Sequence, residues 1–191
     1  MEKERVILGI DPGTNVLGYS IIEQRGKQSQ LLKMDVLVLG TKDDLSTKMK
    51  KLFDQITEII DIFKPDILAI EAPFFGKNVQ SMLKLGRAQG ICIAAAFSRS
   101  IPFVEYSPRK VKQSITGNGA ASKEQVANML QRMFKFEEIP SYLDATDALA
   151  VAVCHSYQKE DLLVSNSSVK KTSSKKSSWA SFVSQNPDRI K

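Results

Sequence analysis

Four acidic residues of the sequence stand at positions where they could act together. Asp11 and Glu71 each end a short apolar run of the kind that forms a strand buried on both faces. Asp144 and Asp147 are three residues apart in a segment rich in Ala and Leu, a spacing that places both on one face of a helix. Taken singly, each acid is explained as readily by a strand end or a helix N-terminus.

Taken together, four converging carboxylates repel one another and need counter-ions. Their charge is matched by two divalent cations, and oxygen ligands favour Mg²⁺ or Mn²⁺ over zinc. Such a two-metal site hydrolyses phosphodiester bonds, because one ion activates water and the other stabilises the leaving oxygen. His155 lies about 12 Å along the helix from Asp147. We therefore interpret it as a surface or packing residue, and Cys92 and Cys154 as packing residues.

A sheet flanked by helices is needed to position these acids. Apolar runs bounded by turn residues predict strands at 6–10, 16–23, 30–39, 66–71 and 101–106. Apolar periodicity predicts helices at 45–63, 78–97, 123–134 and 143–157, with a helical turn from Pro108. A hairpin turning at Gly26, followed by alternating helices and strands, predicts an α/β domain with a mixed sheet. Parallel strand ends share one edge, which would bring Asp11 and Glu71 together.

Five segments carry a specific resemblance when they are taken in order. They are Gly-Ile-Asp-Pro-Gly-Thr at 9–14, Ala-Ile-Glu at 69–71, and the segments 83–90, 111–113 and 144–150. This set resembles the RuvC family of bacterial Holliday junction resolvases, within the RNase H-like superfamily, over about residues 5–157. The resemblance implies an RNase H-like, mixed five-stranded sheet and a magnesium-dependent endonuclease. It also implies that the four acids are the catalytic metal ligands, although some relatives have histidine at the position of Asp144.

The resemblance implies a substrate and partners as well. The expected protein is a homodimer that binds a four-way DNA junction and nicks two strands of like polarity, in cooperation with the RuvA and RuvB branch-migration proteins. A dimer suits a junction that has two-fold symmetry. Gly86, Gly90 and Ala94 share one face of the predicted helix at 78–97. They indicate either tight helix–sheet packing or the region where the dimer forms.

Basic residues near the acids are candidates for DNA contact. Lys112 and Lys123 flank a loop containing two glycines, at 116–122. Composition alone favours two solvated lysines, whereas the resemblance implies that both bind DNA phosphates. Arg109 and Lys110 extend this basic patch, and Lys77 and Lys84 are further candidates.

Two adjacent aromatic residues follow Glu71 closely. Phe74 and Phe75 either anchor a loop to the core or stack on unpaired bases of the DNA. The resemblance assigns the base contact to the position of Phe74.

The charge of the chain is concentrated near its C-terminus. The net charge is +6, of which residues 165–191 carry +5 and residues 1–164 only +1. We predict a nuclease domain over 1–160 and a disordered Ser- and Lys-rich tail over 161–191 that tethers DNA or a partner. DNA affinity of the domain must then come from the local placement of its lysines.

Several other classes of protein are less consistent with the sequence. No apolar run reaches the roughly 18 residues of a membrane span, and a secretory signal is lacking, so we expect a cytoplasmic protein with no membrane contact. Actin-like, phosphate-binding ATPases and sugar kinases also begin with a strand, an Asp-x-Gly-Thr motif and a hairpin, but they need two such domains. An RNase H-like nuclease acting on RNA–DNA hybrids and an inactive junction-binding module remain as alternatives.

Overall fold

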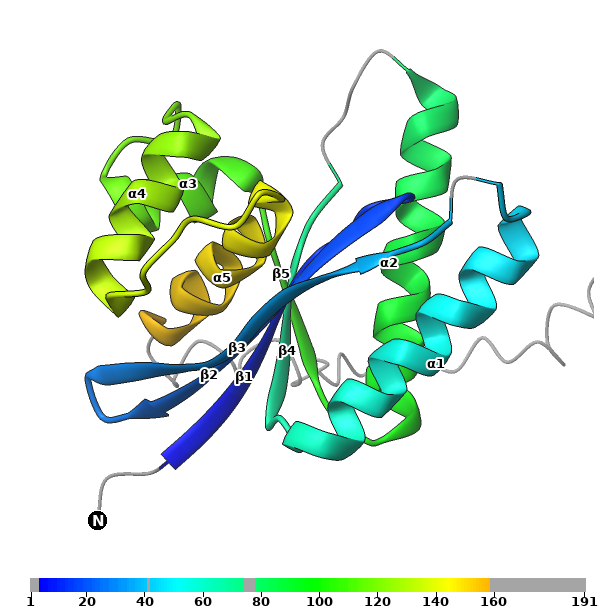
Figure 1. Cartoon of the computed structure of the whole chain (residues 1–191). Coiled ribbons are helices and arrows are strands. Elements are labelled where there is room, and N and C mark those ends of the chain that lie inside the picture. Colours follow the sequence, from blue (N-terminus) through cyan, green and yellow to red (C-terminus); the bar gives the residue numbers. More distant parts are fainter. Residues whose placement is uncertain (1–3, 41, 74–77, 159–191) are drawn as a thin grey trace, which may run out of the picture. The chain divides into compact units, whose positions relative to one another are not determined.

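A mixed five-stranded sheet is the centre of the fold. The computed structural model describes residues 4–40, 42–73 and 78–158. In these residues the strand order is β3-β2-β1-β4-β5 (Figure 1). The strands are β1 (Glu4–Asp11), β2 (Val16–Arg25), β3 (Gln28–Val38), β4 (Ile67–Glu71) and β5 (Phe103–Tyr106). The first three are antiparallel, whereas β1, β4 and β5 are parallel to one another. The predicted fold class is confirmed.

Helices cover both faces of this sheet, as Figure 1 shows. On one face lie α1 (Leu45–Phe63) and α2 (Val79–Ser98), and on the other lie α3 (Pro108–Thr116), α4 (Lys123–Phe134) and α5 (Leu143–Ser156). The turn predicted at Pro108 is a nine-residue helix, because Pro108 opens it and the Ser107 side chain caps it. The predicted domain boundary at residue 160 and the tail over 161–191 lie outside the described residues.

Alternation along the strands divides the core into two halves. Leu8 and Ile10 of β1 belong to the half beneath α1 and α2, whereas Ile7 belongs to the half beneath α3, α4 and α5. Because neighbouring side chains of a strand point to opposite faces, Asp11 ends β1 on the face that α5 covers. The same alternation in β4, where Ile70 lies in the first half, places Glu71 on that face too.

Close approach of backbones seats α5 on the sheet. A Cβ atom at Gly9 would collide with the carbonyl of Ala148, and one at Gly18 would collide with the carbonyl of Asp144. The Ser20 hydroxyl donates a hydrogen bond of 3.0 Å to the Ala148 carbonyl. The N-terminal half of α5 therefore has a fixed depth and register on β1 and β2.

The lone histidine lies in the core. His155 is fully buried, and its Nδ1 lies 2.7 Å from the Tyr106 hydroxyl in a hydrogen bond. Burial, followed by the charges of Arg5 and Lys110, lowers the pKa of His155 to about 4, so the ring is neutral at pH 7. Of the two alternatives for this residue, packing is correct and a surface position is wrong. Cys92 and Cys154 are also buried, as expected. Within the described ranges, no helix is both long and apolar enough to cross a membrane.

Candidate active site

Sheet register brings the first two acids side by side. In the parallel pair of β1 and β4, Ile10 lies opposite Ile70. The next residues of the two strands are Asp11 and Glu71, which therefore end neighbouring strands on the same face. This arrangement at the carboxyl edge of a parallel pair is the one that the sequence predicts.

The helix α5 adds the other two acids from above this edge. Asp11 pairs with Gly18 of β2, and the Asp144 carbonyl lies directly against Gly18. Asp144 lies in the first turn of α5, and Asp147, only 9% exposed, lies one turn further along. The four predicted acids therefore converge on one end of the sheet. The glycine that permits this approach belongs to a motif of the resemblance, but its contact with α5 is not readable from the sequence.

The negative charges of these carboxylates raise one another's pKa values. Burial raises the pKa of Asp11 well above its usual value, and the charges of Glu71, Asp147 and Asp144 raise it further. Burial and the charge of Asp147 raise the pKa of Glu71 to about 7. Burial also raises the pKa of Asp147. Without a cation beside them, some of these groups retain protons near neutral pH.

The positive charge closest to these acids is that of Lys123, the first residue of α4. Its ammonium forms an ion pair with Asp147 and lies 4.0 Å from Oδ1 of Asp144. Burial lowers the pKa of Lys123, but the hydrogen bond and the charge of Asp147 outweigh this effect and raise it. A capping box between Ser122 and Gln125 fixes the helix end that carries this lysine.

A basic pocket of about 650 Å³ opens beside Glu71. Its walls include Arg109, Lys112 and Lys123, together with the loop around Gly119. A Cβ atom at Gly119 would lie 2.6 Å from Cγ of Arg109, so the loop packs closely against that side chain. Lys112 is near enough to lower the pKa of both Glu71 and Asp147. The structure therefore groups three of the eight candidate DNA-binding residues, Arg109, Lys112 and Lys123, around the acids.

The other candidates for DNA contact are not part of this group in the described residues. Phe74, Phe75 and Lys77 fall outside the described residues, so their roles stay predictions. Lys110 stacks over the Tyr106 ring, 5.0 Å from its centroid, and Lys84 lines a different pocket with Lys48. Sequence reasoning did not select Lys48, because its proximity to the sheet edge depends on how α1 docks.

The donor set suits a hard divalent cation. All four side chains supply carboxylate oxygen, the ligand type that Mg²⁺ and Mn²⁺ prefer. In the described part of the chain, no three His, Cys, Asp or Glu side chains stand close enough to hold one ion together. Among the described residues, the Lys123 ammonium forms an ion pair with Asp147 and occupies the space beside one of its carboxylate oxygens.

Comparison with known proteins places the chain in a family. The family model for the crossover junction endodeoxyribonuclease RuvC matches residues 7–155. The chain belongs to the RuvC family. The RuvC protein of Cytophaga hutchinsonii is 54% identical over 188 residues, which cover 98% of this chain and 89% of that protein. The RuvC protein of Porphyromonas gingivalis is 50% identical over 191 residues, which cover 99% and 98% of the two chains.

A solved structure agrees with this assignment. The structure of T. thermophilus RuvC in complex with Holliday junction substrate has a TM-score of 0.75 to this chain and is 31% identical in sequence. The match covers 80% of this chain and 93% of that one. Membership of the RuvC family confirms the resemblance seen in the motifs and disfavours the actin-like alternative.

Proposed function

We propose that this RuvC-family protein is an endodeoxyribonuclease that resolves four-way Holliday junctions at the site of Asp11, Glu71, Asp144 and Asp147. The observation that carries the proposal is the convergence of four carboxylates from β1, β4 and α5 beside a basic pocket. Family relatives of nearly the same length, named crossover junction endodeoxyribonucleases, support the same activity.

The reaction depends on divalent metal. We assign two Mg²⁺ ions per subunit to the four carboxylates, with Mn²⁺ as a substitute. When bound, the ions activate a water molecule and stabilise the leaving oxygen of the phosphodiester. The four acids would hold this charge, and Asp11, Glu71 and Asp147 stand in largely buried surroundings, where electrostatic interactions are stronger than in water.

Basic residues of the chain bring the DNA to this site. Lys112 and Arg109 line the pocket beside Glu71 and are positioned to bind phosphates of the strand that is cut. Lys123 lies in the same pocket, and its ammonium can turn from Asp147 to a DNA phosphate when metal neutralises the acids. We propose Phe74, Phe75 and Lys77 as further contacts, with a ring stacking on an unpaired base.

An unpartnered face of α2 supports a homodimer. An added Cβ atom at Gly86 or Gly90 would meet no atom within 4 Å, and Leu83 and Phe97 on the same side of the helix are 52% and 58% exposed. Tight helix–sheet packing is therefore the wrong explanation for these small residues. They leave open space beside exposed apolar side chains, where a second copy can approach closely, as two-fold cleavage of a junction requires.

The setting of the protein follows from this function. We propose cooperation with RuvA and RuvB, which supply junctions by branch migration, and a cytoplasmic location. The two buried, unbridged cysteines are consistent with a reducing compartment. We also propose that residues 161–191 act as a basic tether. Deleting them should reduce the salt dependence of DNA binding and spare cleavage.

One comparison of substrates tests the proposed function. Wild-type protein is incubated with Mg²⁺ and a labelled mobile four-way junction, a linear duplex of the same sequence, or an RNA–DNA hybrid. We expect paired nicks in the junction that a ligase can seal, and little cleavage of the duplex or hybrid. Preferential cleavage of the hybrid would assign the site to another RNase H-like activity. Junction binding without cleavage would indicate an inactive binding module.

A further inference from the structure

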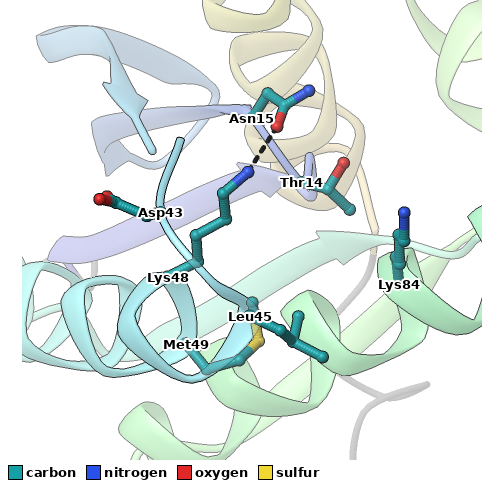
Figure 2. Close-up of a pocket in the computed structure, with 7 residues that line it drawn as sticks. All are labelled: Thr14, Asn15, Asp43, Leu45, Lys48, Met49 and Lys84. Carbon is teal, nitrogen blue, oxygen red and sulfur yellow. Dashed lines mark hydrogen bonds between the residues drawn. The ribbon is translucent and has the colours of Figure 1, made fainter. Parts of the chain in front are cut away.

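A second pocket with basic walls lies at the same edge of the sheet, on the face covered by α1 and α2. It has a volume of about 300 Å³ and is drawn in Figure 2. The lining residues come from the turn after β1, the start of α1 and the first half of α2: Thr14, Asn15, Asp43, Leu45, Lys48, Met49 and Lys84. The basic pocket beside Glu71 lies on the opposite face, with α3 and α4.

Two lysines of this second pocket carry charge that no carboxylate of the described residues neutralises. Nζ of Lys48 donates a hydrogen bond of 2.8 Å to Oδ1 of Asn15, an uncharged group. Lys84 is exposed on α2, across the pocket from Lys48 (Figure 2). Among the described residues, neither lysine forms an ion pair. The carboxylate in the wall, Asp43, is held by Lys51 at 2.7 Å and lies on the side away from Lys84. The pocket therefore has a net positive charge.

The catalytic acids line a further pocket at this edge of the sheet. It has a volume of about 140 Å³, its walls include Asp11, Glu71 and Leu85, and Glu71 also lines the pocket that contains Lys112. Leu85 is the neighbour of Lys84 in α2, and Thr14 follows Asp11 by three residues. A chain of phosphates that passes over the acids therefore meets Lys112 on one face of the sheet and Lys84 and Lys48 on the other.

We propose that the second pocket binds a backbone phosphate of the cut DNA strand, on the other side of the scissile bond from the phosphate that Lys112 contacts. Lys48 and Lys84 supply the charge, and the Thr14 hydroxyl and Asn15 amide supply hydrogen bonds. Leu45 and Met49 give an apolar wall suited to the adjoining deoxyribose. This inference rests on the proposed function, since it names a further contact of the same substrate.

Charge-removing substitutions test the phosphate site. Junction binding is measured from 50 to 200 mM salt for Lys48→Gln and Lys84→Gln, in an Asp11→Asn background that prevents cleavage. Each variant is expected to make the negative slope of log affinity against log salt shallower by about 1. Lys48→Arg is expected to restore the wild-type slope. Lys50→Gln is the matched control, because Lys50 lies on the same helix, pairs with Asp54 and does not line the pocket.

A second measurement locates the phosphate. Single uncharged methylphosphonates are placed at successive positions flanking the cut site. At one position, the methylphosphonate should weaken junction binding by the wild-type sequence, and it should cause a smaller further loss in Lys48→Gln and in Lys84→Gln, because each variant has already lost one of the contacts to that phosphate.

Two outcomes overturn the proposal in distinguishable ways. Unchanged salt slopes for both glutamine variants, or losses that add at every position, overturn the phosphate site and leave the proposed function intact. Failure of the wild-type protein to bind a four-way junction overturns the proposed function and this site with it.

Discussion

Lys123 and Asp147 form an ion pair at the centre of the acidic site, although they belong to different helices. The same ammonium lies 4.0 Å from Asp144, so one lysine partly neutralises both acids of α5. An ammonium and a divalent cation cannot occupy this position together. The site therefore carries an internal cation, which we expect a bound metal to displace.

Removal of the Lys123 charge should change metal affinity and the rate of DNA cleavage in opposite directions. We predict that Lys123→Gln lowers the free energy of unfolding of the metal-free protein by about 1 kcal/mol, since water screens this half-exposed pair. The same change should tighten Mn²⁺ binding, measured by calorimetry, and slow junction cleavage. Lys112→Gln removes a charge from the same pocket without breaking the ion pair, and should affect Mn²⁺ affinity less. Weaker Mn²⁺ binding in Lys123→Gln would contradict competition between the Lys123 ammonium and the metal for the acidic site.

The acid cluster should make metal-free stability depend on pH. Burial and Asp147 raise the pKa of Glu71 from 4.5 to about 7, so the folded protein holds a proton that the unfolded chain releases. The stabilisation is complete below pH 4.5 and is lost as the pH rises to 7. Glu71→Gln should therefore melt at a higher temperature than wild type at pH 8 in EDTA, yet fail to cleave. Glu58→Gln, an exposed change on α1, is the control. Equal pH dependence of melting in wild type and Glu71→Gln would contradict this explanation.

The close approach of α5 to β2 should be sensitive to one methyl group. A Cβ atom at Gly18 would collide with the Asp144 backbone. We predict that Gly18→Ala costs about 1–3 kcal/mol of stability by overpacking, and that displacement of Asp144 and Asp147 reduces junction cleavage at least about tenfold. Gln30→Ala, an exposed change on β3, should retain both stability and activity. Wild-type cleavage by Gly18→Ala would show that the depth of α5 does not set the site.

The exposed face of α2 should control the oligomeric state. Gly90 has no neighbour around its Cβ position, so Gly90→Leu fits the folded monomer and favours the helix by about 1 kcal/mol. The leucine should nevertheless block approach of a second copy. We expect wild type to sediment as a dimer and Gly90→Leu as a folded monomer with the same helix content by circular dichroism. Asn128→Leu, exposed on α4, should remain dimeric. A dimer formed by Gly90→Leu would exclude this face as the interface.

Local signals predicted the parts of the fold and site that depend on neighbouring residues. The bounds of α1 match the prediction to the residue, because Asp44 caps its start and Lys64 and Pro65 end it. Acids at strand ends and the three-residue spacing on α5 were enough to predict that all four carboxylates converge.

Contacts set by helix docking could not be predicted in this way. The pairing of Lys123 with Asp147 joins residues 24 positions apart through the packing of α4 on α5. Whether Gly86 and Gly90 face the sheet or solvent depends on the rotation of α2, and the burial of His155 depends on β5 and Tyr106. None of these relationships leaves a local pattern in the sequence.

Single-turnover cleavage of a labelled mobile four-way junction by wild type and Asp11→Asn tests the central claim most directly. Asp11 ends β1 beside the strand end that carries Glu71, and Asp54→Asn, an exposed change on α1, serves as the matched control. With Mg²⁺ present, we expect wild type and Asp54→Asn to nick two strands of like polarity, EDTA to stop the reaction, and Asp11→Asn to bind the junction without cutting it. Cleavage by Asp11→Asn at the wild-type rate, or wild-type cleavage that persists in EDTA, would contradict a metal-dependent nuclease site at these four carboxylates.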